Sequence, residues 1–484
     1  MKIKLLTTLL GLLFAFTSCE KWISIRPTDR LSEDVLFENK EGYLKALNGV
    51  YVELANPLLY GQFMSTSVVD VLAQYYFLNS STQTFYDYTV FNYSASSVKT
   101  GFDSAWKKSY ALIANTNILL EKCGNAPSAR LPERYYNLIK GETLALRAML
   151  HFDLLRLFGP IYNNEGKSKI AIPYATQPKP VIYPLLTAEE VLNRIIDDLT
   201  AAQELLLRVD PILTEGVKNT ADPLGDNTFN YRQYRLNYFA ATALLARAYL
   251  WKGDHAQALQ YAKEIIQKGQ QPTRPIFPMV TFSAATDSQK PDRLFFTEVL
   301  FGVYTLNRVK MYDNLFSPTQ SPFSRLSFNA SNADRTRVEA WYEDKNDYRY
   351  RVWENSNVDN AFILTNQKYK DYQDAPGQYM IPLIRMSEAY LIAAECAEPL
   401  AEATAYLNAV RTSRNIFSVF PADRDALKNA ITNEYQKEFL GEGQMFFYYK
   451  RNASQTVPNN QALTGTKNMS LTNYVVPIPD SELR

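Results

Sequence analysis

Residues 236–268 of this 484-residue chain, LNYFAATALLARAYLWKGDHAQALQYAKEIIQK, decide its fold class. Within this stretch, apolar side chains recur every three or four positions from residue 236 to 250 and again from 256 to 266. That spacing places them on one face of an α-helix. Gly253 and Asp254 interrupt the pattern between the two runs. The stretch therefore predicts two helices joined by a tight turn.

Small residues on both predicted helices favour a closely packed antiparallel hairpin. Ala246 on the first helix and Ala258 on the second would let the two axes approach each other. A solenoid of such hairpins needs about three of them, and the rest of the chain supplies weaker candidates. The hairpin resembles a tetratricopeptide unit, because matching residue types stand at the offsets of that repeat, namely Leu245, Ala246, Tyr249, Gly253, Asp254 and Ala258.

Helical spacing recurs in further segments, which would supply the remaining helices: 40–54, 101–122, 132–158, 187–207 and 383–414. Gly159-Pro160 would end the third of these helices, and Thr187-Ala188-Glu189-Glu190 has the spacing of a capping box at the start of the fourth. The last segment is predicted to be a second hairpin, with Leu383 on its helical face and Pro399 opening its second helix.

Between residues 270 and 380 the helical pattern gives way to loops and short predicted strands at 298–304 and 350–352. Long irregular segments carried on a rigid scaffold are where binding functions concentrate. We therefore expect a mainly α fold. Tetratricopeptide-like helical hairpins would form a scaffold, and a long, loop-rich lobe containing short strands would be attached to it.

The first 18 residues have the features of a secretory signal peptide. Lys2 and Lys4 precede an apolar run from 5 to 16, which is shorter than the roughly 20 residues of a membrane-spanning helix. Cys19 follows directly, as in lipoproteins whose N-terminal cysteine is acylated after cleavage. The sequence predicts lipid attachment at Cys19 and a tether over 19–30. Secretion with an unmodified Cys19 is the alternative.

Bulk composition bears on partners and on domain organisation. With 51 Lys and Arg against 50 Asp and Glu, the chain has no basic excess to attract nucleic acid. Besides Cys19 only Cys123 and Cys396 are present, so the fold rests on its core, although one bridge between them stays open. The mature chain exceeds the size of a single core. We expect two intimately packed regions, 31–230 and 231–484, in one composite domain.

Motifs for catalysis are not evident. His151 and His255 stand alone, without Cys, His or acidic residues at metal-ligand spacing. The carboxylates of Asp197 and Asp198 would point about 100° apart on a helix and cannot flank one bond, so a solvated face is expected for them. The sequence has no phosphate-binding glycine loop and no nucleophile elbow. We expect no enzyme activity, no cofactor and no metal site.

Seven blocks, in their order along the chain, resemble the SusD/RagB family and together span most of the sequence. Their common order, rather than any one block, carries the resemblance. They are the signal with Cys19; Arg147-Ala148 with LLRLFGP at 154–160; the hairpin at 236–259; PLIR at 382–385 with Glu388 and Tyr390-Leu391; LNAVR at 407–411; 434–451; and VPIP at 476–479 with Glu482-Leu483.

The block at 434–451 departs from the family pattern at some positions. The residues that match are Glu434, Glu438, Glu442, Gly443 and Arg451, and those that differ are Tyr435, Met445 and Tyr448, where Arg, Arg and Asp are usual. A joint loss is coherent, because a half-dismantled buried ion network is costly whereas an apolar substitute can be neutral. We interpret the block as structural, so that the departures bear on the subfamily rather than on the fold.

The resemblance implies a lipid-anchored, cell-surface binding protein of a Bacteroidetes-type bacterium, seated on the outer membrane as a lid over a SusC-like TonB-dependent transporter. Its ligand would be a glycan or oligosaccharide, or a peptide as in RagB-like members. The helical scaffold would contact the barrel, and the irregular lobe would hold the ligand. A tetratricopeptide-like scaffold for envelope assembly and a glycosidase using distant carboxylates are the alternatives.

Aromatic-rich segments supply the candidate ligand contacts. Sugars need flat apolar surfaces against their C–H faces and polar groups around them. The segment 75–88 offers both, since Asn79 and Gln83 stand among its aromatic residues, and Trp353 is followed by several asparagines. Packing of the irregular lobe by the same rings is the alternative. We predict ligand contacts at Tyr75, Tyr76, Phe77, Tyr86, Tyr88 and Trp353.

Overall fold

The computed structural model describes residues 33–179, 181–223, 225–328 and 334–482. The predicted signal peptide, Cys19 and the predicted tether at 19–30 lie outside the described residues. Within the described ranges, no helix combines the length and the apolar character needed to cross a lipid bilayer.

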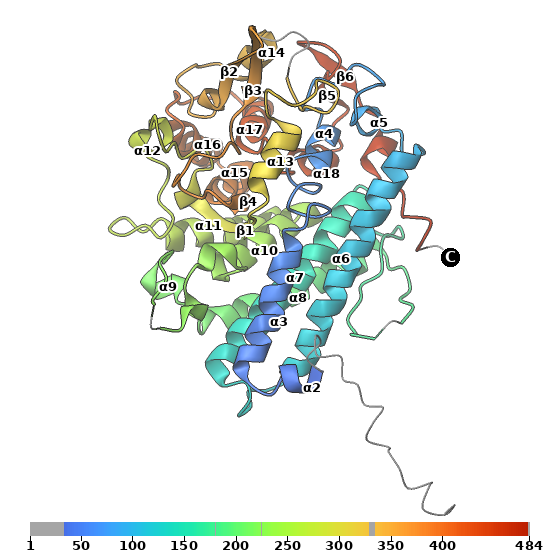
Figure 1. Cartoon of the computed structure of the whole chain (residues 1–484), viewed down its shortest axis with the longest axis vertical. Coiled ribbons are helices and arrows are strands. Elements are labelled where there is room, and N and C mark those ends of the chain that lie inside the picture. The colour runs from blue at the N-terminus through green and yellow to red at the C-terminus, as the bar shows by residue number, and fades with distance from the viewer. Residues whose placement is uncertain (1–32, 180, 224, 329–333, 483–484) are drawn as a thin grey trace, which may run out of the picture.

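The fold is mainly α, as predicted, with a few short strands (Figure 1). The α-helices are α2 (Glu33–Leu36), α3 (Lys40–Leu54), α4 (Val68–Leu72), α5 (Tyr86–Thr89), α6 (Ser96–Cys123), α7 (Glu133–Phe158), α8 (Ala188–Leu207), α9 (Ile212–Glu215), α10 (Tyr238–Lys252), α11 (His255–Gly269), α12 (Phe282–Thr286), α13 (Arg308–Leu315), α14 (Thr336–Trp341), α15 (Met386–Cys396), α16 (Leu400–Ser413), α17 (Arg424–Glu438) and α18 (Met445–Arg451). The 3-10 helices are η2 (Asn227–Phe229), η3 (Arg232–Tyr234), η4 (Phe296–Glu298), η5 (Tyr350–Val352) and η6 (Leu471–Tyr474).

The strands form small antiparallel pairs rather than a large sheet. β1 (Val299–Tyr304) pairs with β4 (Met380–Arg385), β2 (Trp353–Val358) with β3 (Ala361–Asn366), and β5 (Thr456–Pro458) with β6 (Thr466–Asn468). Asp359 and Asn360 turn the β2–β3 hairpin with φ of 50° and 64°, as a tight two-residue turn requires.

The longer helices pack in one continuous series. α6 packs on α7, α7 on α8, α8 on α10, α10 on α11, α11 on α15, α15 on α16 and α16 on α17. The chain between α11 and α15 leaves this series and returns to it, forming much of the irregular lobe in the upper part of Figure 1. The predicted tetratricopeptide-like scaffold with an attached irregular lobe is therefore confirmed.

The hairpin that decided the fold class has the predicted geometry. The side chain of Asn237 accepts a hydrogen bond from the Ala240 N–H at 3.0 Å and caps α10. Gly253 ends that helix in the left-handed region, at φ +81°, and the Asp254 side chain caps α11. Ala246 and Ala258 are fully buried in one cluster between the helices. Small side chains at this crossing allow the close approach.

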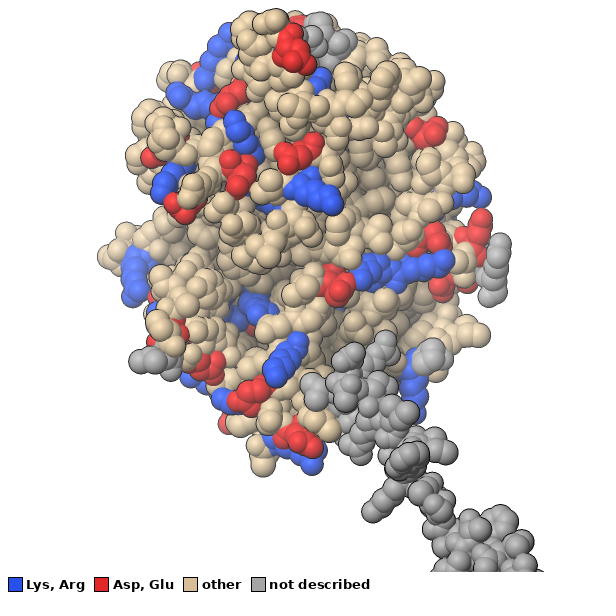
Figure 2. Space-filling model, viewed as in Figure 1, with Lys and Arg blue, Asp and Glu red and all other residues tan. Residues whose placement is uncertain are grey.

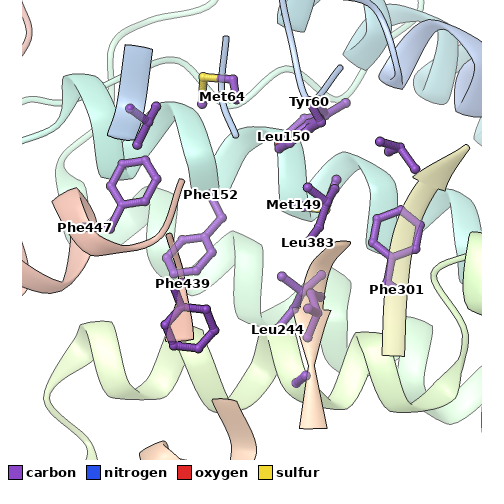
Figure 3. Packing of buried hydrophobic residues seen from close by; sticks show 14 of the residues in the cluster. Tyr60, Met64, Met149, Leu150, Phe152, Leu244, Phe301, Leu383, Phe439 and Phe447 are labelled. Atoms are coloured by element: carbon purple, nitrogen blue, oxygen red, sulfur yellow. The ribbon is translucent and has the colours of Figure 1, made fainter. Parts of the chain in front are cut away.

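Two predicted helix ends are also confirmed. α7 ends at Gly159, and Thr187 and Glu190 form the reciprocal capping box at the start of α8. One hydrophobic cluster joins the scaffold to the irregular lobe, containing residues from Phe37 to Val476. Figure 3 shows part of it, where side chains of α7, α10, β1 and β4 meet, including Met149, Leu150, Phe152, Leu244, Phe301 and Leu383. The division at residues 230 and 231 stays a prediction.

Some local predictions were wrong. Leu383 lies in β4, whose residues are all buried, and not on a helix. A wholly buried strand has no alternation of exposed and buried positions, so its apolar run was mistaken for the start of the following helix. Residues 350–352 form the 3-10 helix η5 rather than a strand. The strand predicted at 298–304 is present as β1.

The cysteines, Asp198 and His151, which the sequence analysis considered as possible functional groups, all serve the packing of the fold. Cys123 and Cys396 are free and buried. Asp198 does not lie on a solvated face, because Arg147 binds it through two hydrogen bonds of 2.7 Å and Tyr174 donates a third. The buried His151 ring stacks on Tyr174, with centroids 3.9 Å apart. These groups stabilise the contact between α7 and α8.

A buried ion cluster lies where the irregular lobe meets the scaffold. Glu438 pairs with Arg349, Arg385 and Arg414, and Arg414 also pairs with Glu298. The neighbouring acids are also paired with basic residues. Glu434 pairs with Arg349 and Arg411, and Glu442 pairs with Lys368 and Arg385. The matching acids of the block at 434–451 therefore hold together four distant segments, which supports a structural role for that block.

Candidate functional site

A hollow of about 560 Å³ opens in the irregular lobe between three segments of the chain. Residues 285–295 form one wall, residues 345–354 the opposite wall, and residues 370–372 complete the lining. Figure 2 shows that charged side chains of both signs gather over this part of the molecule, where Figure 1 places α12 and β2. A volume of this size suits a small organic ligand.

Asp287 and Asp292 shape the first wall. The Asp287 side chain accepts hydrogen bonds of 2.8 Å from the N–H groups of Gln289 and Lys290, which turns the chain after α12. Asp292 is buried, and both its carboxylate oxygens accept the Phe296 N–H at 2.9 Å. Burial raises the pKa of Asp292 to about 6. The two carboxylates thus fix the loop that forms this wall.

Phe295, a buried residue of the first wall, contacts the ion cluster. Its backbone has φ of 54°, in the left-handed region that a bulky side chain rarely adopts. The guanidinium carbon of Arg414 lies 4.1 Å from the centroid of its ring, a cation–π contact. Because Arg414 is held by Glu298 and Glu438, the ion cluster supports the floor of the hollow.

Aromatic rings line much of the remaining surface. Tyr350 and Tyr372 are half-buried, whereas Tyr348 and Trp353 are buried with part of their surface toward the hollow. The Tyr350 hydroxyl accepts a hydrogen bond from Arg335 Nε at 3.0 Å. The Tyr372 ring lies 5.0 Å from the guanidinium carbon of Arg293. Half-buried, oriented rings next to polar groups are the surface that saccharides need.

Most of the predicted ligand contacts lie elsewhere, in the core. Tyr75 donates a hydrogen bond to the Gln436 carbonyl at 2.8 Å, and the Tyr76 ring packs against Phe316 and Phe328. The structure brings together the buried residues Tyr75, Tyr76, Phe77 and Tyr88 with the half-buried Tyr86 in one segment, but not at the hollow. Ligand binding by that segment stays a prediction, and Tyr86 is its accessible member.

Trp353 is the predicted residue that does line the hollow. The residue is 3% exposed, and its ring packs on Phe328 with centroids 4.2 Å apart. Sequence reasoning missed Tyr350, Arg351 and Tyr372. For Tyr350 and Arg351 the nearest signal in the sequence was the dense run of aromatic and charged residues from 341 to 353, whereas Tyr372 lies outside that run.

Within the described ranges, no group of three or more His, Cys, Asp or Glu side chains could hold a metal ion. Burial lowers the pKa of His151 to about 3, so its ring is neutral at physiological pH. Its Nε2 atom lies 3.1 Å from the Ala175 N–H, which donates to it. His255 is exposed at the first position of α11. Neither histidine lies at the hollow.

Two known protein families match this chain, one in its N-terminal half and one in its C-terminal part. Residues 45–209 match a SusD-like family described as "Starch-binding associating with outer membrane", and residues 336–484 match the family described as "SusD family". Together the two matches span more than half of the chain. The chain belongs to the SusD family.

Individual SusD-family proteins are distant in sequence but close in fold. "SusD-like protein P25" of Formosa agariphila is 23% identical over 231 residues, which is 44% of this chain and 39% of that protein. The match thus spans well under half of that relative. A SusD superfamily protein from Bacteroides thetaiotaomicron is 21% identical, with a TM-score of 0.69, over 92% of this chain and 97% of the other.

A second solved structure gives the same result. A SusD-like carbohydrate binding protein from Bacteroides vulgatus is 21% identical, with a TM-score of 0.67, over 92% of this chain and 96% of that one. At this level of identity, the likeness shows the fold over nearly the whole chain.

Proposed function

We propose that this SusD-family protein captures an oligosaccharide at the hollow lined by Tyr350, Trp353 and Tyr372. The observation that carries the proposal is the pairing of half-buried tyrosines with polar and charged groups around a volume of about 560 Å³. The family description as starch-binding supports a saccharide over other ligands. The protein would bind without cleaving, so incubation with a bound saccharide should release no new reducing ends.

The proposal includes a lipid anchor at Cys19 and a place on the outer membrane, facing outward. The family description names an association with the outer membrane, and the sequence up to Cys19 has the lipoprotein pattern. Intact mass of the purified mature protein should show acyl chains on Cys19. A Cys19→Ala variant should lose membrane association and keep its saccharide binding, whereas an unmodified Cys19 would contradict the anchor.

The bound saccharide would pass to a SusC-like TonB-dependent transporter, with the helical scaffold against the barrel. Gentle detergent extraction and affinity purification of the tagged protein should recover an outer-membrane barrel in a stable complex. Recovery of the protein alone, with saccharide binding intact, would contradict the partnership and leave the binding function standing.

Calorimetric titration with saccharides selected from a glycan array tests the binding site. Tyr350→Ala and Tyr372→Ala should each weaken binding by about tenfold, since a ring stacked on a sugar contributes on the order of 1–2 kcal/mol. Tyr261→Ala removes a similarly half-buried ring from the α10–α11 hairpin and serves as the control.

The same titration separates the alternatives. Loss of binding in Tyr86→Ala, with the hollow variants unaffected, would move the site to the segment 75–88. Binding of peptides and no saccharide would favour a peptide-capturing protein.

A further inference from the structure

The ionisable groups around the hollow differ in whether the protein already engages them. The lining contains the basic residues Arg293, Lys345, Arg351 and Lys370 and the acidic residues Asp287, Asp292 and Glu354. This composition is nearly balanced, as it is in the whole chain, with 51 basic and 50 acidic residues. The charges that matter for a ligand are therefore those left without a partner.

The carboxylates of the lining are all engaged. Glu354 pairs with Arg293, and buried Asp292 accepts the Phe296 N–H with both oxygens. Asp287 accepts two backbone N–H groups, which lowers its pKa. None of these groups needs a ligand to satisfy it, because protein donors already meet each carboxylate.

Two of the four basic side chains pair with carboxylates, and the other two form no ion pair with any described residue. Lys345 pairs with Glu339 at 2.8 Å, and Arg293 pairs with Glu354. In the described part of the chain, no carboxylate lies within ion-pair distance of Arg351 or Lys370. The Lys370 ammonium instead lies 5.3 Å from the centroid of the Tyr372 ring. The ionic groups free to meet a ligand are therefore cationic.

A second hollow, elsewhere in the described part of the chain, provides a contrast. It measures about 600 Å³ and lies between α6 and residues 476–481. Its charged residues pair with opposite charges, since Lys99 lies 3.3 Å from Asp480 and Asp103 lies 2.7 Å from Lys107. Unpaired cations are thus a feature of the hollow in the irregular lobe and not of large hollows in general.

We infer that the saccharide captured at this hollow is anionic, carrying a carboxylate or sulfate that Arg351 and Lys370 bind while its ring packs against Tyr350 and Tyr372. The inference rests on the proposed function, because it names the ligand class of the same site. A guanidinium forms paired hydrogen bonds with both carboxylate and sulfate, and an ammonium adds a compact positive charge. A carboxylate or a sulfate would accept charge-assisted hydrogen bonds from both Arg351 and Lys370.

The test compares anionic and neutral saccharides on the mature protein. The probes are hexagalacturonate, a sulfated carrageenan hexasaccharide and a glycan array that contains uronate, sulfated and neutral members. At least one anionic class should bind, and the methyl ester of a bound uronate should bind at least tenfold more weakly. Raising NaCl from 50 to 500 mM should weaken the binding of the anionic probe and leave the affinity for neutral probes unchanged.

Charge variants connect the preference to the two residues. Arg351→Gln and Lys370→Gln should each raise the Kd of the anionic probe about tenfold, as expected for a charge-assisted hydrogen bond. Arg208→Gln removes an exposed cation at the end of α8 and should change nothing. Both hollow variants should keep the melting temperature of the wild-type protein, because the two side chains make no ion pair in the described structure.

Each other outcome overturns the inference in a distinct way. If neutral saccharides bind and the two charge variants leave their affinity unchanged, the anionic class is wrong while saccharide capture stands. If no saccharide of either kind binds, both proposals fail. If only acidic peptides bind, the charge is right and the saccharide class is wrong.

Discussion

The phenol rings of Tyr435 and Tyr448 pack together, with centroids 4.5 Å apart and planes inclined by 31°. Both side chains are buried, and they stand where the SusD family usually has Arg and Asp. The Tyr448 hydroxyl shares a 2.8 Å hydrogen bond with Thr432. A buried ring pair therefore joins α17 and α18, next to acids of the same block that keep their ionic partners.

This replacement predicts strong coupling between the two positions. Tyr448→Asp alone buries a carboxylate near Glu395 and should cost about 3–5 kcal/mol of unfolding free energy. Adding Tyr435→Arg should recover at least about 1 kcal/mol of that loss, since the new charges can pair. Urea denaturation of both single variants and the double variant measures the coupling. Additive effects would mean that the two sites are independent.

The ion cluster around Glu438 predicts a loss of stability in acid. Burial by itself would raise the pKa of Glu438, but Arg414 and Arg385 outweigh it and hold that pKa well below 4.5. The folded state thus keeps this carboxylate ionised where the unfolded chain is protonated. Its contribution is complete above about pH 4.5 and is lost as the pH falls toward the folded-state pKa.

Glu438→Gln measures that contribution. The variant should lose about 3–5 kcal/mol at pH 7, because it leaves buried arginines without their partner. Denaturation at a series of pH values should show a smaller difference between variant and wild type below pH 4. A difference that stays constant from pH 7 to pH 3 would contradict the assignment.

Lys450 should also make the protein less stable as the pH falls, but in the alkaline range. Its ammonium is buried and donates to the carbonyls of Gly159 and Leu157, at 2.7 and 3.2 Å. Burial, with a contribution from Arg156, lowers its pKa well below 10.5. The unfolded chain therefore takes up this proton more readily, and the contribution of Lys450 to stability falls as the pH drops below about 10.4.

Lys450→Met removes the titrating group and tests this sign. The melting temperature of the variant minus that of the wild type should increase as the pH falls from 10 through 9 and 8 to 7. A variant that runs parallel to the wild type over this range would show that Lys450 titrates normally.

Replacing Gly253 should lower the unfolding free energy through backbone conformation alone. Its φ of +81° lies in the left-handed region, and a Cβ added there would meet no atom within 4 Å. Gly253→Ala should therefore destabilise by about 1 kcal/mol through the backbone alone. Asn tolerates this conformation better, so Gly253→Asn should cost less. Equal losses in the two variants would point to a steric cause instead.

The scaffold could be predicted from the sequence because its signals are local. Helical spacing fixed α3, α6, α7, α8, α10 and α11 to within a few residues, and the caps at Thr187 and Gly253 marked their ends. β4 was missed because a fully buried strand and a buried helix have the same apolar run. Only the tertiary pairing of β4 with β1 distinguishes them.

The hollow could not be predicted because its residues come from three segments far apart in the chain. Tyr350 and Tyr372 become neighbours of Asp292 only through the loop that Phe295 and the ion cluster hold in place. Aromatic content alone was ambiguous. The same density of rings in segment 75–88 mostly packs the core, as the alternative interpretation expected, while Trp353 reaches the hollow.

The most direct measurement is a crystal structure of the mature protein with a saccharide identified by the binding screen. The account predicts electron density for a sugar ring against Tyr350 and Tyr372, with any acidic group toward Arg351 and Lys370. Density at the segment 75–88 or on the helical scaffold, with the hollow empty, would contradict it.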